Sequence, residues 1–350
     1  RKGGLVRVLM TGHEGYIGSV MAPWLLAAGI EVHGLDSGLF AGCDFGTPPP
    51  AIPSRRIDLR DVSEADLTGF DAVVHLAAIS NDPLGNLNPR CTYQINHEAS
   101  VRLAERAREA GVSRFLYSSS CSVYGAASPD DVLDESASFS PVTPYAESKV
   151  WVERDVARLA NDDFSPVFLR NATVYGVSPR LRGDLVVNNL VGWAFATGRV
   201  LLKSDGSPWR PLVHVEDVCR AFLAVLRADR SRIHGEAFNV GRTGENYRIS
   251  QVADSVREVV KGSRIDFEEG AGPDPRCYRV RFEKIESTLP EYQPVWTVRA
   301  GVEELERAYR LHGLRSQDLE GSRYLRIRRI QEFLDQGRLD ADLRWVESRS

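Results

Sequence analysis

The chain has 350 residues, of which 43% are hydrophobic, so it can bury the core of one large domain or of two closely joined ones. Its formal net charge of −4, without a long basic run, weighs against nucleic acid as a partner. The sequence contains no apolar stretch of about 18 residues, so we expect neither a membrane span nor a membrane partner. The five cysteines are scattered and form no CxxC pair, which predicts no disulfide framework, no metal site and, without a signal-peptide pattern, a cytoplasmic location.

The first predicted element is an apolar strand over residues 5–10 that runs into a turn with three regularly spaced glycines. An apolar helix follows over about 16–28. Glycines at three-residue spacing leave room for a pyrophosphate, which the backbone N–H groups and the positive end of the helix then face. No Lys-Ser or Lys-Thr pair follows the last glycine, so the turn is not a P-loop. The pattern predicts the phosphate-binding corner of a Rossmann fold, with these candidate contacts: Gly12, Gly15, Tyr16, Ile17 and Gly18.

Acidic residues stand at the ends of the next two predicted strands. The strand over 31–35 ends at Asp36, about twenty positions after the glycines. A carboxylate there can accept hydrogen bonds from the adenosine ribose hydroxyls and repels the extra phosphate of NADP, so it predicts NAD as the cofactor rather than a mere turn residue. The strand over 55–59 carries Asp58, which either reaches the adenine amino group or only opens a turn.

Strands and helices alternate through the next part of the chain. Residues 71–78 form an apolar strand, typical of burial on both faces, whose small last residues permit close approach by a cofactor. A helix over 91–110 contains Asn96, which we expect to hydrogen-bond a neighbouring strand rather than to catalyse, and a strand over 114–118 follows. The alternation favours a parallel sheet with right-handed crossovers. Further cofactor contacts are expected at Leu59, Leu76, Ala77 and Ala78.

Serine hydroxyls and a Tyr–Lys pair follow the fifth strand. Residues 118–125 read Ser-Ser-Ser-Cys-Ser-Val-Tyr-Gly at the carboxyl end of that strand, where open α/β sheets place catalytic groups. A predicted helix that ends near residue 161 carries Tyr145 and Lys149, which share one face because they are four residues apart. An ammonium beside a phenol favours the phenolate, and a positive nicotinamide ring adds to the effect. We therefore predict that Tyr145 is a base near neutral pH.

These motifs, in this order, resemble the extended short-chain dehydrogenase/reductase family over roughly residues 5–290. The resemblance implies an α/β fold with a Rossmann-type doubly wound parallel sheet and a smaller, mostly helical substrate-binding domain. It also implies NAD as the cofactor, a nucleotide-diphosphate sugar as the substrate, and Ser120, Tyr145 and Lys149 as catalytic residues. The residues that match the family are Gly12, Gly15, Gly18, Asp36, Asp58, Tyr145, Lys149 and the segment 118–125.

The two residues after Ser120 help to separate the reactions of this family. By the family pattern, sugar 4,6-dehydratases usually carry Asp-Glu there and uronic acid decarboxylases a Glu, whereas this chain has Cys121 and Ser122. The UDP-galactose 4-epimerase-like group has small residues in both places. The resemblance therefore implies an NAD-dependent nucleotide-sugar epimerase that acts at C4 through a 4-keto sugar, with Cys121 as a wall residue of the substrate site or a proton carrier. The alternatives are a 4-ketoreductase or dehydratase acting on a nucleotide deoxysugar and, from another class, a non-catalytic NAD-binding sensor.

The resemblance also implies where the nucleotide sugar binds. Thr173 stands where many relatives have a substrate-contacting Asn, and Asn188 lies in a helix that opens near Asp184, where relatives bind the diphosphate. Arg210 and Arg276 lie in two segments that match further phosphate-binding segments of the family, and a guanidinium can fork onto a phosphate. We expect six residues to contact the substrate, which are Cys121, Ser122, Thr173, Asn188, Arg210 and Arg276.

The last hundred residues read as helices near 249–260, 299–311 and 320–336. An arginine cluster in the last of them is expected to be a solvated helix face, and comprises Arg323, Arg326, Arg328 and Arg329. The resemblance implies a homodimer through the helices 91–110 and 144–161. We expect an NAD-binding domain and a nucleotide-sugar-binding domain, which comprise residues 1–170 plus about 212–241 and about 171–211 plus 242–345.

Overall fold

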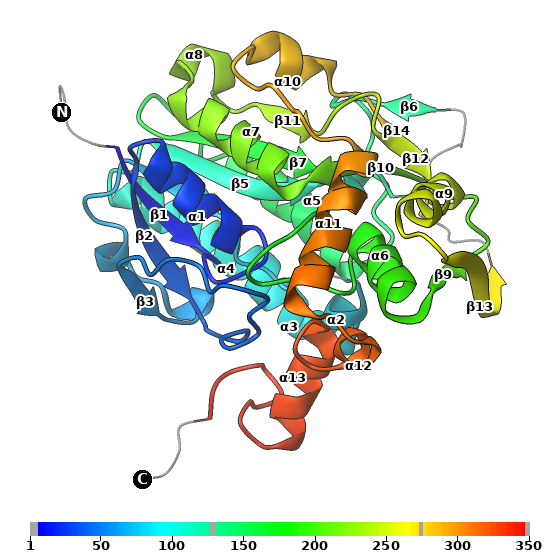
Figure 1. The fold of residues 1–350 in the computed structure, drawn as a ribbon. Coiled ribbons are helices and arrows are strands. Elements are labelled where there is room, and N and C mark those ends of the chain that lie inside the picture. The colour runs from blue at the N-terminus through cyan, green and yellow to red at the C-terminus, as the bar shows by residue number, and fades with distance from the viewer. Residues whose placement is uncertain (1–5, 81, 126–130, 273–275, 347–350) are drawn as a thin grey trace.

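The computed structural model describes residues 6–80, 82–125, 131–272 and 276–346. Its centre is a parallel sheet of seven strands in the order β3-β2-β1-β4-β5-β7-β11 (Figure 1). The strand order reverses between β1 and β4, which is where open α/β sheets form a binding crevice. The strands of this sheet are β1 (Arg7–Thr11), β2 (Glu31–Asp36), β3 (Ser54–Arg56), β4 (Ala72–His75), β5 (Arg114–Ser120), β7 (Ser165–Asn171) and β11 (Ala237–Val240).

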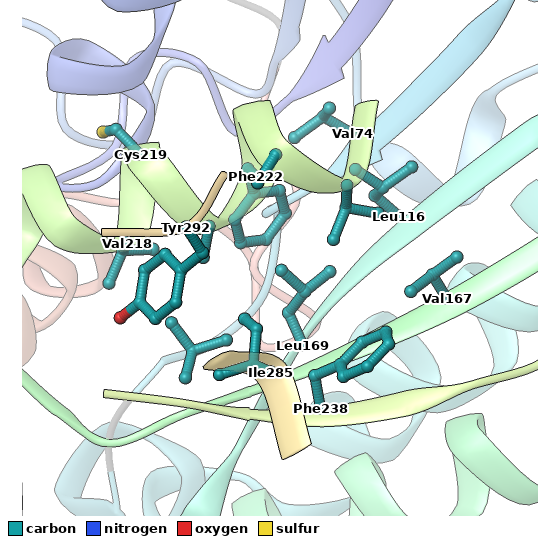
Figure 2. Packing of buried hydrophobic residues seen from close by; sticks show 14 of the residues in the cluster. Val74, Leu116, Val167, Leu169, Val218, Cys219, Phe222, Phe238, Ile285 and Tyr292 are labelled. Atoms are coloured by element: carbon teal, nitrogen blue, oxygen red, sulfur yellow. The ribbon is translucent and has the colours of Figure 1, made fainter. Parts of the chain in front are cut away.

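Helices cover both faces of the central sheet, as a doubly wound fold requires. On one face α1 and α7 pack together, and Figure 2 shows Phe222 of α7 among Val74, Leu116 and Leu169 of the sheet. On the other face, α4 and α5 bury a second apolar cluster against the same strands. The helices are α1 (Gly18–Ala27), α7 (Val215–Arg227), α8 (Arg230–Ile233) and α10 (Glu283–Thr288), and opposite them α3 (Pro89–Tyr93), a π-helical turn (Gln94–Glu98), α4 (Ala99–Glu109) and α5 (Pro144–Ala157).

A separate apolar cluster forms the core of the region that covers the carboxyl ends of the sheet. Residues 212–214, which the sequence analysis assigned to the NAD-binding domain, belong to β10, and this strand joins a three-stranded sheet in the order β12-β10-β8 instead of the central sheet. The sequence analysis predicted no strand at β6, β8, β9, β12, β13 or β14, most of which are short or half-exposed. The elements are β8 (Thr173–Tyr175), α6 (Val186–Thr197), β9 (Arg199–Ser204), β10 (Trp209–His214), β12 (Asn246–Arg248), α9 (Ile249–Val259), β13 (Arg264–Gly272) and α11 (Val298–His312), with β6 (Val132–Leu133) paired to β14 (Arg279–Val280).

The chain ends in two short helices that return to the nucleotide side of the molecule. These are α12 (Ser316–Glu320) and α13 (Arg326–Asp335), and α13 lies beside α2 (Asp82–Leu87) (Figure 1). The helices predicted near 249–260 and 299–311 are thus confirmed as α9 and α11, and the one predicted near 320–336 is found mainly as the shorter α13. Where the predicted domains divide stays a prediction. Among the described residues, every helix is too short or too polar to cross a bilayer.

Candidate active site

One continuous cavity of about 1370 Å³ runs along the carboxyl ends of β1, β2, β4, β5 and β7. It reaches from the glycine turn to α6 and to the start of α13. This volume exceeds the roughly 300–1,000 Å³ of most small-molecule pockets, so the cavity has room for more than one ligand. It is lined by every residue predicted to be catalytic or to bind the cofactor, and by four of the six predicted to bind the substrate, which are Ser122, Thr173, Arg210 and Arg276.

The glycine turn has the shape that a pyrophosphate needs. Gly12 has φ +74°, and a Cβ there would lie 2.7 Å from the Ala77 nitrogen, so a side chain is excluded. A Cβ at Gly18 would overlap the Gly12 carbonyl oxygen, which lets α1 start directly behind the turn. A Cβ at Gly15 would meet only that same oxygen, at 3.0 Å, and Gly15 lines the cavity. The turn therefore leaves backbone N–H groups and a helix N-terminus open to an anion, as NAD requires.

The two acidic residues of the adenosine side differ in their surroundings. Asp36 accepts hydrogen bonds from the backbone N–H groups of Glu14, at 3.1 Å, and Gly38, at 2.9 Å, which fix its carboxylate at the cavity wall. Asp58 is engaged by Arg60, whose Nη2 lies 2.6 Å from it, and it caps the 3-10 turn that follows. Burial raises the pKa of Asp58, but the Arg60 hydrogen bonds outweigh burial and lower it overall. Asp58 is thus a turn residue, and its contact with adenine stays a prediction.

The predicted catalytic residues meet at the end of β5. Thr143 caps α5 by accepting a hydrogen bond from the Ala146 N–H, so Tyr145 lies in the first turn of the helix and Lys149 one turn later. Tyr145 forms a side-chain hydrogen bond with Ser120. The Lys149 Nζ donates to the Ser118 carbonyl oxygen at 2.7 Å and lies 5.6 Å from the centroid of the Tyr145 ring. The three side chains therefore converge on one part of the cavity.

The pKa of Tyr145 departs from the predicted direction. Burial and, to a smaller extent, the charge of Asp82 raise the pKa of Tyr145 to about 12, and the Ser120 hydrogen bond and the charge of Arg182 offset this rise only in part. Burial also lowers the pKa of Lys149 to about 7, against the opposing charge of Glu153. The protein alone does not provide the low phenol pKa that the Tyr–Lys spacing suggests, because desolvation acts on both groups.

The two residues after Ser120 face opposite ways. Cys121 is fully buried in the core, its Sγ donates to the Arg170 carbonyl oxygen at 3.1 Å, and burial raises its pKa well above the usual value. The predicted role of Cys121 as a wall residue or proton carrier is therefore wrong, because the 3-10 turn at Cys121–Tyr124 points it away from the cavity. Ser122 lines the cavity, and its buried Oγ has no hydrogen-bond partner among the described residues.

Strand pairing brings a polar residue beside Ser120 that the sequence analysis did not assign to the site. Ser120 of β5 pairs with Asn171 of β7. The Asn171 amide donates to Ser118 Oγ at 3.0 Å, while its Oδ1 is buried and, within the described chain, lacks a partner. Asn171, Ser122 and Thr173 thus contribute polar groups to the cavity that Tyr145 also lines.

Asn188 is a second correction. Its side chain is fully buried, where it accepts a hydrogen bond from the Gly176 N–H at 3.0 Å and donates to the Arg182 carbonyl oxygen at 3.1 Å. It holds the loop before α6 in place and does not line the cavity. Its neighbour Asn189 does line the cavity, because one step along a helix turns the side chain by about 100°.

Arg210 and Arg276 lie together at the cavity wall. The Arg210 guanidinium donates to the Trp209 carbonyl oxygen at 2.8 Å and to the carbonyl oxygen of Arg276. Arg276 forms an ion pair with Asp82 at 2.6 Å. Asp274, in the same predicted segment, lies outside the described residues. That these arginines bind a diphosphate stays a prediction.

Three further arginines line the cavity unexpectedly, namely Arg182, Arg326 and Arg328. Arg182 is buried and bonds Asp184 through two nitrogens, the closer at 2.7 Å. Arg326, which was expected on a solvated helix face, is only 4% exposed, so that expectation is wrong for it. The Arg-Leu-Arg-Gly-Asp sequence at 180–184 was a usable signal for the first of these. No sequence signal places Arg326, because its burial depends on packing across the whole chain.

The fold and the converging Ser, Tyr and Lys residues are those of a Rossmann-type dehydrogenase-related enzyme. The model of the NAD dependent epimerase/dehydratase family matches residues 8–241, well over half of the chain, and the chain belongs to this family. The resemblance to the extended short-chain dehydrogenase/reductase family, the fold class, the enzyme class and the NAD dependence are thereby confirmed.

Named relatives of this family are similar to the chain over most of its length. The UDP-glucose 4-epimerase of Mycolicibacterium smegmatis is 33% identical over 245 residues, which cover 67% of this chain and 77% of that protein. The structure of MoeE5 in complex with UDP-glucuronic acid and NAD has a TM-score of 0.75 at 28% identity, covering 87% of this chain and 99% of that one. The dTDP-glucose 4,6-dehydratase DesIV from Streptomyces venezuelae, with NAD and TYD bound, has a TM-score of 0.76 at 25% identity, covering 89% and 100%.

Proposed function

We propose that the protein is an NAD-dependent nucleotide-sugar epimerase that inverts C4 through a 4-keto sugar. The observation that carries the proposal is the convergence of Ser120, Tyr145 and Lys149 on the cavity that also contains the glycine turn. The similarity to proteins named UDP-glucose 4-epimerase supports the same reaction.

NAD, when bound, supplies the oxidation of the sugar carbon and its later reduction. Tyr145 takes the proton of the C4 hydroxyl and returns it after the sugar has turned over in the cavity. Ser120, which is hydrogen-bonded to Tyr145, holds the sugar oxygen in line with the phenol. Lys149 contributes a positive charge close to the phenol and is held there by the Ser118 carbonyl oxygen.

The substrate half of the proposal is a nucleoside diphosphate sugar. Arg210, Arg276 and Asn189 offer donors for the diphosphate at the cavity wall. The Ser122 Oγ and Asn171 Oδ1 atoms, which have no partner among the described residues, suit sugar hydroxyls, which both donate and accept hydrogen bonds. Elimination of water needs an added acid and base. The position that dehydratases use for this is occupied by Cys121 in the core and by neutral Ser122, so the epimerase is favoured over the dehydratase.

A panel of UDP-, GDP-, dTDP- and CDP-sugars followed by NMR tests the proposal. Wild-type protein should yield the C4-inverted sugar without net consumption of NAD, and Tyr145→Phe should lose at least about a hundredfold in kcat, the typical contribution of general acid–base catalysis. Tyr93→Phe is the matched control, because its hydroxyl bonds Glu147 outside the cavity. Equal turnover by Tyr145→Phe would contradict the mechanism. A dehydrated product, or a stoichiometric need for reduced cofactor, would replace the epimerase by a dehydratase or a ketoreductase.

We further propose a homodimer through the helices 91–110 and 144–161. In support, Tyr93 stacks on Trp151 with ring centroids 4.8 Å apart, which gives the two helices a half-buried aromatic surface. Light scattering should give twice the chain mass, and the substitution Ala157→Arg on the exposed face of α5 should give a monomer. A wild-type monomer would refute this assembly.

A cytoplasmic location is part of the same proposal, since the five cysteines are free in the structure. Cell fractionation should recover the protein in the cytoplasmic fraction, and recovery elsewhere would contradict this location.

A further inference from the structure

Arg326, the first residue of α13, presents a buried guanidinium to the cavity. Its Nη2 donates to the Arg180 carbonyl oxygen at 3.3 Å, and its Cζ lies 3.8 Å from the centroid of the Phe40 ring. Its Nη1 is buried and has no hydrogen-bond partner in the part of the chain that the structure describes. A buried N–H without an acceptor is unfavourable, so the site favours a ligand that supplies one.

The neighbours of Arg326 connect it to the glycine turn. The Arg180 Nε donates to the carbonyl oxygen of Glu14, which lies inside that turn, at 3.2 Å. Phe40 belongs to the loop that follows Asp36 at the end of β2. One neighbour of the Arg326 guanidinium, Arg180, thus reaches the glycine turn, and the other, Phe40, lies in the loop that follows the predicted ribose-binding residue.

The charge around Arg326 also points to an anion. Arg182 is paired with Asp184, and Arg180 is paired with Asp44. Arg326, in contrast, forms no ion pair with any described residue. Burial and the positive charge of Arg182 lower the pKa of Arg326 to about 10, so it remains a cation at neutral pH. An excess positive charge that is buried beside a cavity is stabilised best by an anion in that cavity.

The remainder of the C-terminal segment, which we define as residues 326–346, fastens α13 to the nucleotide side. Arg344 pairs with Asp61 at 2.6 Å, and the Trp345 Nε1 donates to the Ser37 carbonyl oxygen at 2.7 Å. Leu343 is buried and lines the cavity. In Figure 1 this segment runs from α13 back beneath the strand β3. Contacts at both of its ends therefore keep Arg326 at a fixed place.

We propose that Arg326 binds the pyrophosphate of the dinucleotide from the side opposite the glycine turn, and that the C-terminal segment is a third wall of the cofactor site. The proposal rests on the proposed function only in taking NAD as the cofactor. The turn offers backbone N–H groups to one side of the diphosphate, and the guanidinium offers a planar pair of donors to the other. The diphosphate of the nucleotide sugar has the same chemistry, but Arg326 contacts the loops around the turn and not the wall that holds Arg210 and Arg276.

Equilibrium binding to the full-length protein, freed of nucleotide, tests this assignment. Arg326→Met should weaken NAD, ADP-ribose and ADP about 10- to 100-fold, the range of a charge-assisted hydrogen bond, and leave adenosine and UDP unchanged. Arg326→Lys should lose less, because it keeps the charge but not the fork. Arg329→Met is the control for a loosened helix: Arg329 is in the same helix and donates to the Ala41 carbonyl oxygen, but it does not line the cavity.

Thermal unfolding separates this binding role from a structural one. Arg326→Met removes an unpaired buried cation beside Arg182, so without NAD it should unfold at the wild-type temperature or higher, and NAD should raise that temperature less than in wild type. Unchanged NAD binding, equal weakening of adenosine, or weaker UDP with normal NAD would each overturn the assignment. If NAD binding depends on Arg326 but the wild-type protein converts none of the nucleotide sugars, the proposed epimerase function is refuted and the role of Arg326 is supported.

Discussion

The ion pair between Glu153 and Arg170 should be the most sensitive support of the catalytic end of the sheet. Both side chains are only 6% exposed, and Arg170 bonds the Glu153 carboxylate through two nitrogens at 2.7–3.1 Å. Ser119 donates to the same carboxylate at 2.5 Å, and Tyr124 accepts from Arg170 at 3.0 Å. The pair therefore ties α5, one turn after Lys149, to β5 and β7.

The burial of this pair sets the expected magnitude. Glu153→Ala leaves the Arg170 guanidinium buried without its counter-charge, which typically costs about 3–5 kcal/mol in the free energy of unfolding. Glu258 and Arg299 provide a control at the same 2.7 Å separation, but their side chains are 56% and 58% exposed. Glu258→Ala should cost at most about 1 kcal/mol, because water screens an exposed pair.

Urea unfolding followed by far-UV circular dichroism measures both changes. The double variant Glu153→Leu with Arg170→Leu should recover much of the loss of Glu153→Ala, because it removes both buried charges together. If Glu153→Ala costs no more than Glu258→Ala, then distance rather than burial decides the strength of these pairs, and the reasoning is refuted.

Further substitutions test individual features of the site. Burial lowers the pKa of Lys149 to about 7. Above that pH the unfolded chain binds a proton that the folded protein lacks. Between pH 7 and 9 the free energy of unfolding, measured with urea, should therefore rise by about 2 kcal/mol more in wild type than in Lys149→Met. No such gain would contradict the lowered pKa. Cys121→Ala should lower stability by about 1–2 kcal/mol and leave KM for the sugar nucleotide unchanged, whereas Ser122→Ala should raise KM and leave stability unchanged. The opposite pattern would return Cys121 to the site. Gly15→Ala should fold and bind NAD at least about tenfold more weakly, while Gly18→Ala should unfold at a lower temperature, because its Cβ overlaps backbone. Equal unfolding temperatures would refute this reading of the turn.

Local patterns predicted the parts of the site that depend on neighbouring residues in the chain. The glycine turn and the Tyr–Lys helix face follow from spacing alone, and each lines the cavity as expected. At Cys121 and Asn188 the predicted substrate contact is buried, and the next residue in the chain lines the cavity. A 3-10 turn in the first case and the phase of a helix in the second decide which neighbour faces the ligand. Residues that reach the site through long-range packing had no local signal, and Arg326 is the example.

The pKa values of the Tyr–Lys pair show why a base of this kind depends on its cofactor. Moving the Tyr145 pKa from about 12 to near 7 requires roughly 7 kcal/mol of stabilisation of the phenolate. A protonated Lys149, whose Nζ lies 5.6 Å from the centroid of the Tyr145 ring, contributes about 3 kcal/mol at an effective dielectric constant of 20. A further positive charge would have to supply the remaining roughly 4 kcal/mol. In the proposed enzyme, the oxidised nicotinamide ring would supply that positive charge when NAD is bound. Without it, the phenol stays protonated, so the base becomes active only after the oxidised cofactor is in place.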